Sequence, residues 1–427
     1  MSITNSLYIG VNGLTAHGDA ISIVGDNIAN TSTIGFKRER AQFADMLGGE
    51  LGAQRLGGGS RLGGTQTMFD QGAISTTGNP LDLAIRGGGM FVVKGSHGGQ
   101  QDAQFYTRDG RMHMDNQGYV VNTGGLRLQG YMIDSAGTRA TSPSDLPIGA
   151  RQSPPVPTAN AKLTLNLDAG AVPPAAWDPA NPTTTSNYAT SMTVYDSLGA
   201  AHHTEVYFRA QGAGAWEWHA MVDGGELTGG TAGTPTEIAS GTMAFNAAGA
   251  LQSQATTTSS ASFVNAVPSQ AIAFNFGDDI ASGGTGLVGT TQFSGSSAVN
   301  GTDIDGHASG TLTDVVISDD GKIQGVFDNG DRIDLAQVSL AEFANEEGLV
   351  RGGDGLWSQS ATSGQPLIDA VGVGARGSIT SGSLEQSNVD LGNELVTLIA
   401  YQRAFQANAK TVTTADEMMN DVTNLKR

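Results

Sequence analysis

The chain has 427 residues, among them 61 glycines and no cysteine, and its formal net charge is −19. This length predicts two to four domains, and the glycine content favours short strands and turns over a helical enzyme core. The acidic balance argues against a nucleic-acid partner, which needs clustered Lys and Arg, and the lack of cysteine excludes disulfides and thiolate metal sites. The polar residues 1–6 do not resemble a secretory signal, and no apolar run reaches the roughly 18 residues of a membrane span, so no membrane insertion is expected.

The first expected element is an amphipathic helix over residues 1 to about 35. Apolar side chains recur on it at the seven-residue spacing of a coiled-coil seam: Leu7, Leu14, Ile21 and Ile28.

The sequence that follows predicts an abrupt end of this helix. Asn27 and Asn30 tolerate the left-handed conformation that ends helices, and Gly35 permits a positive φ. Phe36 then offers one large apolar anchor beside a basic cluster. The chain is therefore expected to leave the helix at a fixed place.

The middle of the chain predicts three further parts. Residues 36–75 read as a linking segment, and residues 76–145 with 303–383 as one discontinuous inner β domain. An outer β domain, residues 146–302, is inserted in it and is opened by a proline-rich stretch.

Turn signals support strands in both β domains. Asp320-Gly321 and Asn329-Gly330 separate short apolar runs in the inner domain, and residues 193–208 read as a hairpin in the outer one.

The last expected element is a long helix from residue 384 to the end of the chain. It repeats the seven-residue apolar spacing, with one apolar neighbour beside the stripe: Leu384, Leu391, Leu395, Leu398, Phe405, Val412 and Met419. We expect these apolar side chains of both helices to form an assembly interface. Glycines in the first helix cost about 1 kcal/mol each, so the helix pair should need neighbouring molecules to become ordered.

Signals of catalysis or ligand binding are weak. Gly-x-Gly-x-x-Gly occurs at 284–289 and at 372–377, but neither site opens a helix as dinucleotide binding requires. The histidines lack metal-ligand spacing, and no acidic segment has the twelve-residue calcium pattern. We therefore predict no catalytic, cofactor-binding or metal residues, and no cofactor.

Several sequence blocks resemble the bacterial flagellar axial family of rod and hook proteins. The blocks stand in the family's order along the chain: residues 27–37, 69–72, 77–85, 384–391 and 401–410. The chain has a large middle segment and in this respect resembles the hook members of the family, since the rod members lack such an insertion. The family motif includes Asn27, Asn30, Gly35 and Phe36.

The resemblance implies a multidomain structural subunit, with a coiled-coil-like helical domain from both chain ends and mostly-β inner and outer domains. It implies a helical homopolymer, the curved and flexible tube that transmits torque from rod to filament. Rod proteins, the hook cap, hook-filament junction proteins and the flagellar export apparatus are the implied partners, and the extracellular hook at the basal body is the implied location.

Other interpretations stay open on the sequence. The chain could be a distal rod protein or another axial protein. A protein of a different class, a secreted carbohydrate-binding or adhesive module, would use the middle domain as its binding surface.

Overall fold

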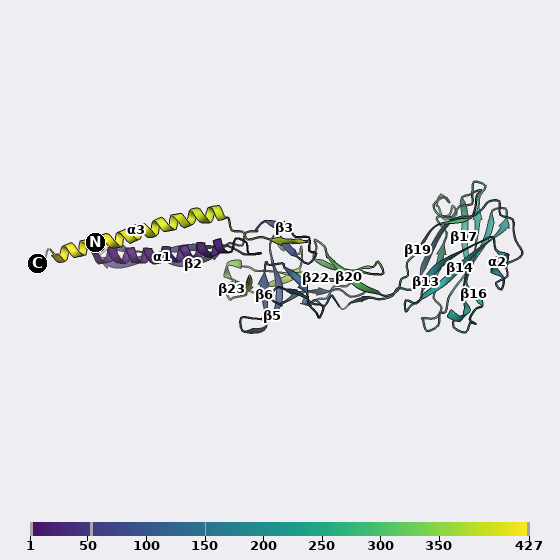
Figure 1. The fold of residues 1–427 in the computed structure, drawn as a ribbon, viewed down its shortest axis with the longest axis horizontal. Helices are drawn as coiled ribbons and strands as arrows, with labels where there is room; N and C mark the ends of the chain where they lie inside the picture. Colours follow the sequence, from purple (N-terminus) through teal and green to yellow (C-terminus); the bar gives the residue numbers. More distant parts are fainter. Residues whose placement is uncertain (1–2, 52–53, 150, 425–427) are drawn as a thin grey trace. The chain divides into compact units, whose positions relative to one another are not determined.

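The computed structural model describes residues 3–51, 54–149 and 151–424. The chain divides into two compact units, which Figure 1 colours by sequence. Unit 1 comprises residues 1–151, 312–326 and 332–427, and unit 2 comprises residues 152–311 and 327–331. Strands dominate both units, and the long helices belong to the chain ends.

The two chain ends of unit 1 form a helical layer with a β-hairpin. Its elements are α1 (Ile3–Ala29), β1 (Glu39–Leu51), β2 (Gln54–Thr67) and α3 (Leu391–Asn424). Helix α1 packs against α3 and against the β1–β2 hairpin, and the two helices lie side by side in Figure 1.

The β1–β2 hairpin lies within the segment expected only to link. Its antiparallel register runs from Glu39↔Thr67 to Leu51↔Gln54. Strand β2 could not be predicted from the sequence, because its glycines interrupt the alternation of apolar and polar residues that indicates a strand. They also permit close packing: a Cβ on Gly59 would lie 3.3 Å from the Cα of Ile9 in α1.

The C-terminal helix begins at Leu391 rather than at residue 384. Leu384 lies in strand β27 (Ser383–Glu385), so the helical expectation for residues 384–390 is wrong. The Asp390 carboxylate accepts hydrogen bonds from the backbone N–H groups of Gly392 and Asn393 and thereby caps the helix start.

The remaining strands of unit 1 form one large sheet and two small ones. The main path runs β20-β21-β22-β9-β5-β6-β24-β23, and the small sheets are β26-β4 and β27-β3. The bounds are β3 (Ile74–Thr76), β4 (Leu83–Arg86), β5 (Met90–His97), β6 (Gln100–Thr107), β7 (Met112–Met114), β8 (Val120–Asn122), β9 (Arg127–Met132), β10 (Ser144–Asp145), β20 (Gly310–Ile317), β21 (Lys322–Phe327), β22 (Arg332–Glu342), η2 (Glu346–Gly348), β23 (Val350–Gly353), β24 (Leu356–Ser358), β25 (Leu367–Ala370) and β26 (Ser378–Ser381).

Both turns expected in the inner domain are confirmed. Gly321, with φ +74°, lies between β20 and β21, and Gly330, with φ +89°, lies between β21 and β22. The main sheet buries an apolar cluster that includes Met90, Tyr106 and Trp357.

Unit 2 packs an antiparallel sheet and a smaller mixed sheet around one core. The five-stranded sheet has the order β13-β14-β15-β16-β17, and the three-stranded sheet has the order β18-β12-β19. The bounds are β11 (Gln152–Ser153), β12 (Asn160–Asn166), α2 (Pro182–Thr185), β13 (Tyr188–Tyr195), β14 (Ala201–Gly212), β15 (Ala215–Asp223), η1 (Gly224–Glu226), β16 (Pro235–Phe245), β17 (Leu251–Ser259), β18 (Ala273–Asn275) and β19 (Ala298–Ile304). Trp216, Trp218 and Phe208 are fully buried in the core.

The hairpin expected over residues 193–208 is confirmed. Tyr195 pairs with Ala201, and the turn between them is closed by the Asp196 carboxylate, which accepts from the backbone N–H groups of Leu198 and Ala200.

Candidate assembly site at the junction of the chain ends

The segment that follows α1 is held in place by the backbone of Gly35 and by the buried side chain of Phe36. Gly35 has φ +68°, and its amide donates to the backbone oxygen of Glu385 at 2.8 Å. Phe36 is 6% exposed, and an apolar anchor at this place requires such burial. A Cβ on Gly35 would lie 2.6 Å from the backbone of Arg108, so this position requires glycine for space as well as for conformation.

The expected role of the asparagines at the helix end is wrong. Neither Asn27 nor Asn30 has a positive φ. Asn27 instead lies inside α1 with its amide buried. Its Oδ1 accepts from the backbone N–H of Glu39, and its Nδ2 donates to the backbone oxygen of Glu39 and to Glu394 Oε2. Asn27 therefore joins α1 to the start of β1 and to α3.

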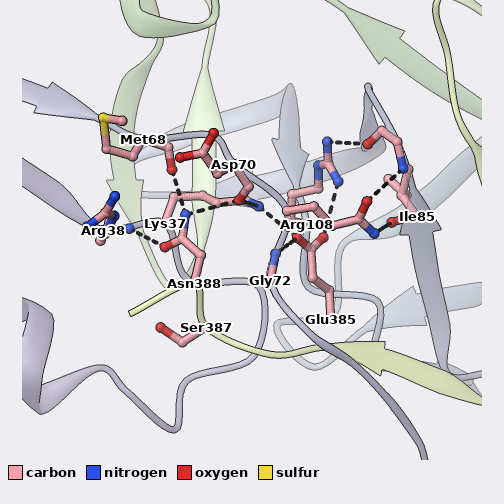
Figure 2. Close-up of polar contacts among 12 residues, drawn as sticks. Lys37, Arg38, Met68, Asp70, Gly72, Ile85, Arg108, Glu385, Ser387 and Asn388 are labelled. Carbon is pink, nitrogen blue, oxygen red and sulfur yellow. Dashed lines mark hydrogen bonds and ion pairs between the residues drawn. The ribbon is translucent and has the colours of Figure 1, made fainter. Parts of the chain in front are cut away.

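Glu385 lies at the centre of a buried charge network (Figure 2). Its Oε1 is 2.7 Å from Lys37 Nζ, and its Oε2 is 3.1 Å from Arg108 Nη1. All three side chains are at most 4% exposed. Since a buried charge needs a partner, each of these groups depends on the others.

Backbone groups complete this network. The Glu385 carboxylate also accepts a hydrogen bond from the backbone N–H of Gly72 at 2.9 Å. Lys37 Nζ donates to the backbone oxygen of Asp70 at 2.8 Å, and Arg108 Nη2 donates to the backbone oxygen of Gly87 at 2.9 Å. The network thus joins the segment after α1, the segment before β3, strand β27 and the inner β sheet.

Asn388 joins the same segments by its amide (Figure 2). Its Oδ1 accepts from the Arg38 amide at 2.8 Å, and its Nδ2 donates to the backbone oxygens of Met68 and Asp70 at 2.8 and 3.0 Å. Because Asn388 lies shortly before α3, which begins at Leu391, these bonds fix where the C-terminal helix leaves the β region.

The network shifts the pKa of its lysine. Burial lowers the pKa of Lys37 below its usual value, and the charge of Arg108 acts in the same direction, whereas Glu385 opposes both. Burial also raises the pKa of Glu346, which lies close enough to interact with both cations.

Small residues make the closest contact between α1 and α3. A Cβ on Gly10 would lie 2.8 Å from Val412 Cγ2, and one on Gly13 would lie 2.6 Å from Asn408 Cγ. Ala16 and Ala20 are also buried. The glycines that lower helix propensity therefore permit the close approach of the two helices.

The predicted interface residues surround this contact without forming its centre. Those on α1 are half-buried: Leu7, Leu14, Ile21 and Ile28. On α3, Leu391, Leu395 and Phe405 are 46%, 44% and 39% exposed, whereas Leu398, Val412 and Met419 are half-buried. A seven-residue stripe drifts by about 20° per heptad around a straight helix, which explains why it faces solvent near Leu391 and α1 near Val412.

An aromatic cluster ties the β1–β2 hairpin to both helices. The His17 ring of α1 lies 5.1 Å from the Phe43 ring of β1 and 6.0 Å from the Tyr401 ring of α3. Sequence analysis missed this cluster and the Glu385 network, because their members lie far apart in the chain.

The part of the chain that the structure describes offers neither a metal-ligand cluster nor a membrane-spanning helix. Among the described residues, three or more His, Asp or Glu side chains never gather as metal ligands would. Helices long and apolar enough to span a membrane are likewise missing from the described part of the chain.

Four family models match successive parts of the chain. Residues 7–37 match the model of the flagella basal body rod protein, and residues 84–166 match the flagellar hook protein FlgE/F/G D1 domain. Residues 166–307 match the flagellar basal body protein FlaE D2 domain, and residues 380–425 match the flagellar basal body rod FlgEFG protein C-terminal region.

Curated relatives match over nearly the whole length. The flagellar hook protein FlgE of Escherichia coli (strain K12) is 33% identical over 97% of this chain and 98% of its own. FlgE of Salmonella typhimurium is 33% identical with the same coverage, and FlgE of Treponema pallidum is 33% identical over 99% of both chains. The chain therefore belongs to the flagellar hook protein FlgE family.

Proposed function

We propose that this structural subunit of the flagellar hook, which is not an enzyme, polymerises through its terminal helices. Self-polymerisation and partners in the basal body follow from the family. The finer proposal is that α1 and α3 pack in a coiled-coil-like layer with the helices of neighbouring copies.

The observation that carries this proposal is an exposed apolar stripe on α3. Leu391, Leu395 and Ile399 follow one another at the four-residue spacing of one helix face and are 46%, 44% and 50% exposed. Helices of globular proteins bury such a face, and contiguous apolar surface marks an interaction site. A second copy of the chain is the occupant that a polymer supplies.

Further exposed or half-buried apolar residues lie on α3 and on the hairpin. Leu398 and Phe405 lie beside the stripe, and on the hairpin Phe43 and Leu47 are 40% and 69% exposed. Within one chain, glycines of α1 meet Val412 and Asn408 of α3. The exposed side chains of Leu391, Leu395 and Ile399 remain for contacts with neighbouring copies.

The division into four functional parts is also part of the proposal. In it the ends, residues 1–35 and 384–427, form the assembly layer and residues 36–75 link it to the inner β domain. Residues 76–145 with 303–383 form that inner domain, and residues 146–302 form the outer one. Rod proteins, the hook cap and the hook-filament junction proteins would meet the polymer at its ends, and the flagellar export apparatus would deliver the chain to the extracellular hook.

Electron microscopy of the purified protein tests the proposal. We expect the full chain to form tubes of constant diameter under assembly conditions, and a chain ending at residue 390 to remain monomeric because it lacks α3. An adhesive module would instead bind carbohydrate without forming tubes. Tubes from the truncated chain would contradict the role of α3.

A further inference from the structure

His202 on β14 meets a carboxylate at each ring nitrogen. Its Nδ1 lies 2.7 Å from Glu226 Oε2, and its Nε2 lies 3.3 Å from Asp196 Oδ2. The residue is 7% exposed, and its ring stacks on Phe263 with centroids 3.8 Å apart. A buried histidine between two acids is outside the helical layer and plays no part in the proposed assembly.

Only the protonated ring satisfies both carboxylates. Neutral imidazole has one N–H, so it donates to one carboxylate and turns a lone pair toward the other. Imidazolium donates to both, and stacking on an aromatic face stabilises a cation further.

Asp196 is held ionised by several donors. Burial alone would raise the pKa of Asp196, but the backbone N–H groups of Ala200 and Leu198, together with His202, lower it. Asp196 is 2% exposed, and the His202 ring is the titratable group in contact with its carboxylate.

The contact joins three segments at one end of the five-stranded sheet. Asp196 begins the β13–β14 turn, Glu226 belongs to η1, and Phe263 belongs to the segment after β17. Two further bonds cross between these segments: Val264 N to Glu226 O, and Val267 N to Ser197 Oγ, both at 2.9 Å.

Other charged groups on the packed elements have different partners. His203 alternates with His202 on β14 and is exposed. Glu205 accepts from the Tyr207 hydroxyl, and the Asp223 carboxylate accepts from the backbone N–H groups of Gly225 and Gly233. The segment of residues 261–270 contains no titratable side chain.

We propose that His202 is a pH-sensitive clamp, which as an imidazolium ties the three segments of unit 2 together and on losing its proton releases one carboxylate and loosens this end of the sheet. The clamp is closed in acid and opens as the pH rises, because the ring must keep both N–H groups to hold both acids. Unit 2 would therefore be more deformable in alkaline surroundings.

Hydrogen exchange of the full chain at pH 6 and pH 9 tests the clamp. After correction for the intrinsic pH dependence of exchange, we expect protection of peptides covering residues 196–200 and 261–268 to fall about tenfold from pH 6 to pH 9. A hydrogen bond to a charged group is of this size, about 1.4 kcal/mol. The His202→Gln variant should lose this pH dependence, and His203→Gln, the matched control on the exposed side of β14, should keep it.

If His202→Gln does not fold, the protonation of the His202 ring can be measured directly in the wild type. Nitrogen chemical shifts of the wild-type imidazole distinguish the cation from each neutral tautomer, and we expect the cation at pH 6 and a neutral tautomer at pH 9. A neutral ring at pH 6, or equal protection of the wild type at both pH values, would overturn the proposal.

Discussion

Glu385 holds two buried cations, and neither Lys37 nor Arg108 has another carboxylate within ion-pair distance among the described residues. Such an arrangement adds little net stability relative to an apolar core, but losing one partner is costly because the remaining charges stay buried. The network therefore specifies how the chain ends join the β region more than it stabilises them.

Removing the charge of Glu385 tests whether the two buried cations depend on it. We expect Glu385→Gln to lower the free energy of unfolding of unit 1 by about 3 to 5 kcal/mol, because two buried cations lose their counter-ion. Urea denaturation of the full chain measures this loss. Glu347→Gln, a control at an exposed position, should change stability by less than about 0.5 kcal/mol, and a Glu385→Gln effect of similar size would refute the role of the network.

Tyr106 predicts an alkaline loss of stability. Burial raises its pKa to about 12, so between pH 10 and pH 12 the unfolded chain ionises this tyrosine while the folded chain does not. Stability therefore falls with rising pH in this window, by about 1.4 kcal/mol at pH 11 from this group. Tyr106→Phe, which keeps the ring beside Phe343, should show a shallower decline by this amount in chemical denaturation at pH 9 and pH 11; identical slopes would contradict the assignment.

At the scale of elements, the helices, the main turns and the β character could be predicted, because each depends on a local pattern. Apolar spacing indicated both terminal helices, and Asp390, a good N-cap residue, was the available signal for the later start of α3. The β1–β2 hairpin could not be found, since its glycines serve contact with α1. The Glu385 network could not be predicted either, because its partners Lys37 and Arg108 come from distant parts of the chain.

The helix glycines fall into two kinds. Gly10 faces Val412, whereas nothing lies within 4 Å of the Cβ position of Gly25. We expect Gly25→Ala to raise the melting temperature of assembled tubes, by helix propensity worth about 0.5 to 1 kcal/mol, and Gly10→Ala to lower it, since the branched Val412 side chain has little freedom to move. Circular dichroism of tubes during heating measures both; stabilisation by Gly10→Ala would contradict the close helix contact.

At the scale of the whole molecule, unit 2 has its own sheets and its own core, built around Trp216 and Trp218. The chain enters and leaves it at neighbouring residues, since Ser153 pairs with Gly310. Because unit 2 has a core of its own, we expect assembly and unit 2 to be separable.

Deleting most of unit 2 tests this separation. Replacing residues 154–309 by a four-residue Gly-Ser turn should leave tube formation intact, because the paired strands β11 and β20 hold the cut ends together. Tubes of the shortened chain should differ in curvature or flexibility when examined by electron microscopy. Complete loss of assembly would show that the outer domain carries an indispensable contact.

The central claim is that one apolar stripe of α3 is an assembly seam. Leu395 and Ala400 are both exposed but lie about 140° apart around the helix. Leu395→Asp would bury an unpaired charge in every subunit contact, at a cost of several kcal/mol, whereas Ala400→Asp lies outside the stripe.

Electron microscopy of these two variants under assembly conditions is the most direct measurement, with the thermal unfolding of the monomers as a control for folding. We predict that Leu395→Asp, like Leu398→Asp beside it, forms no tubes although its monomer melts within about two degrees of the wild type, and that Ala400→Asp forms normal tubes. Normal tubes from Leu395→Asp, or loss of tubes from Ala400→Asp alone, would contradict the account.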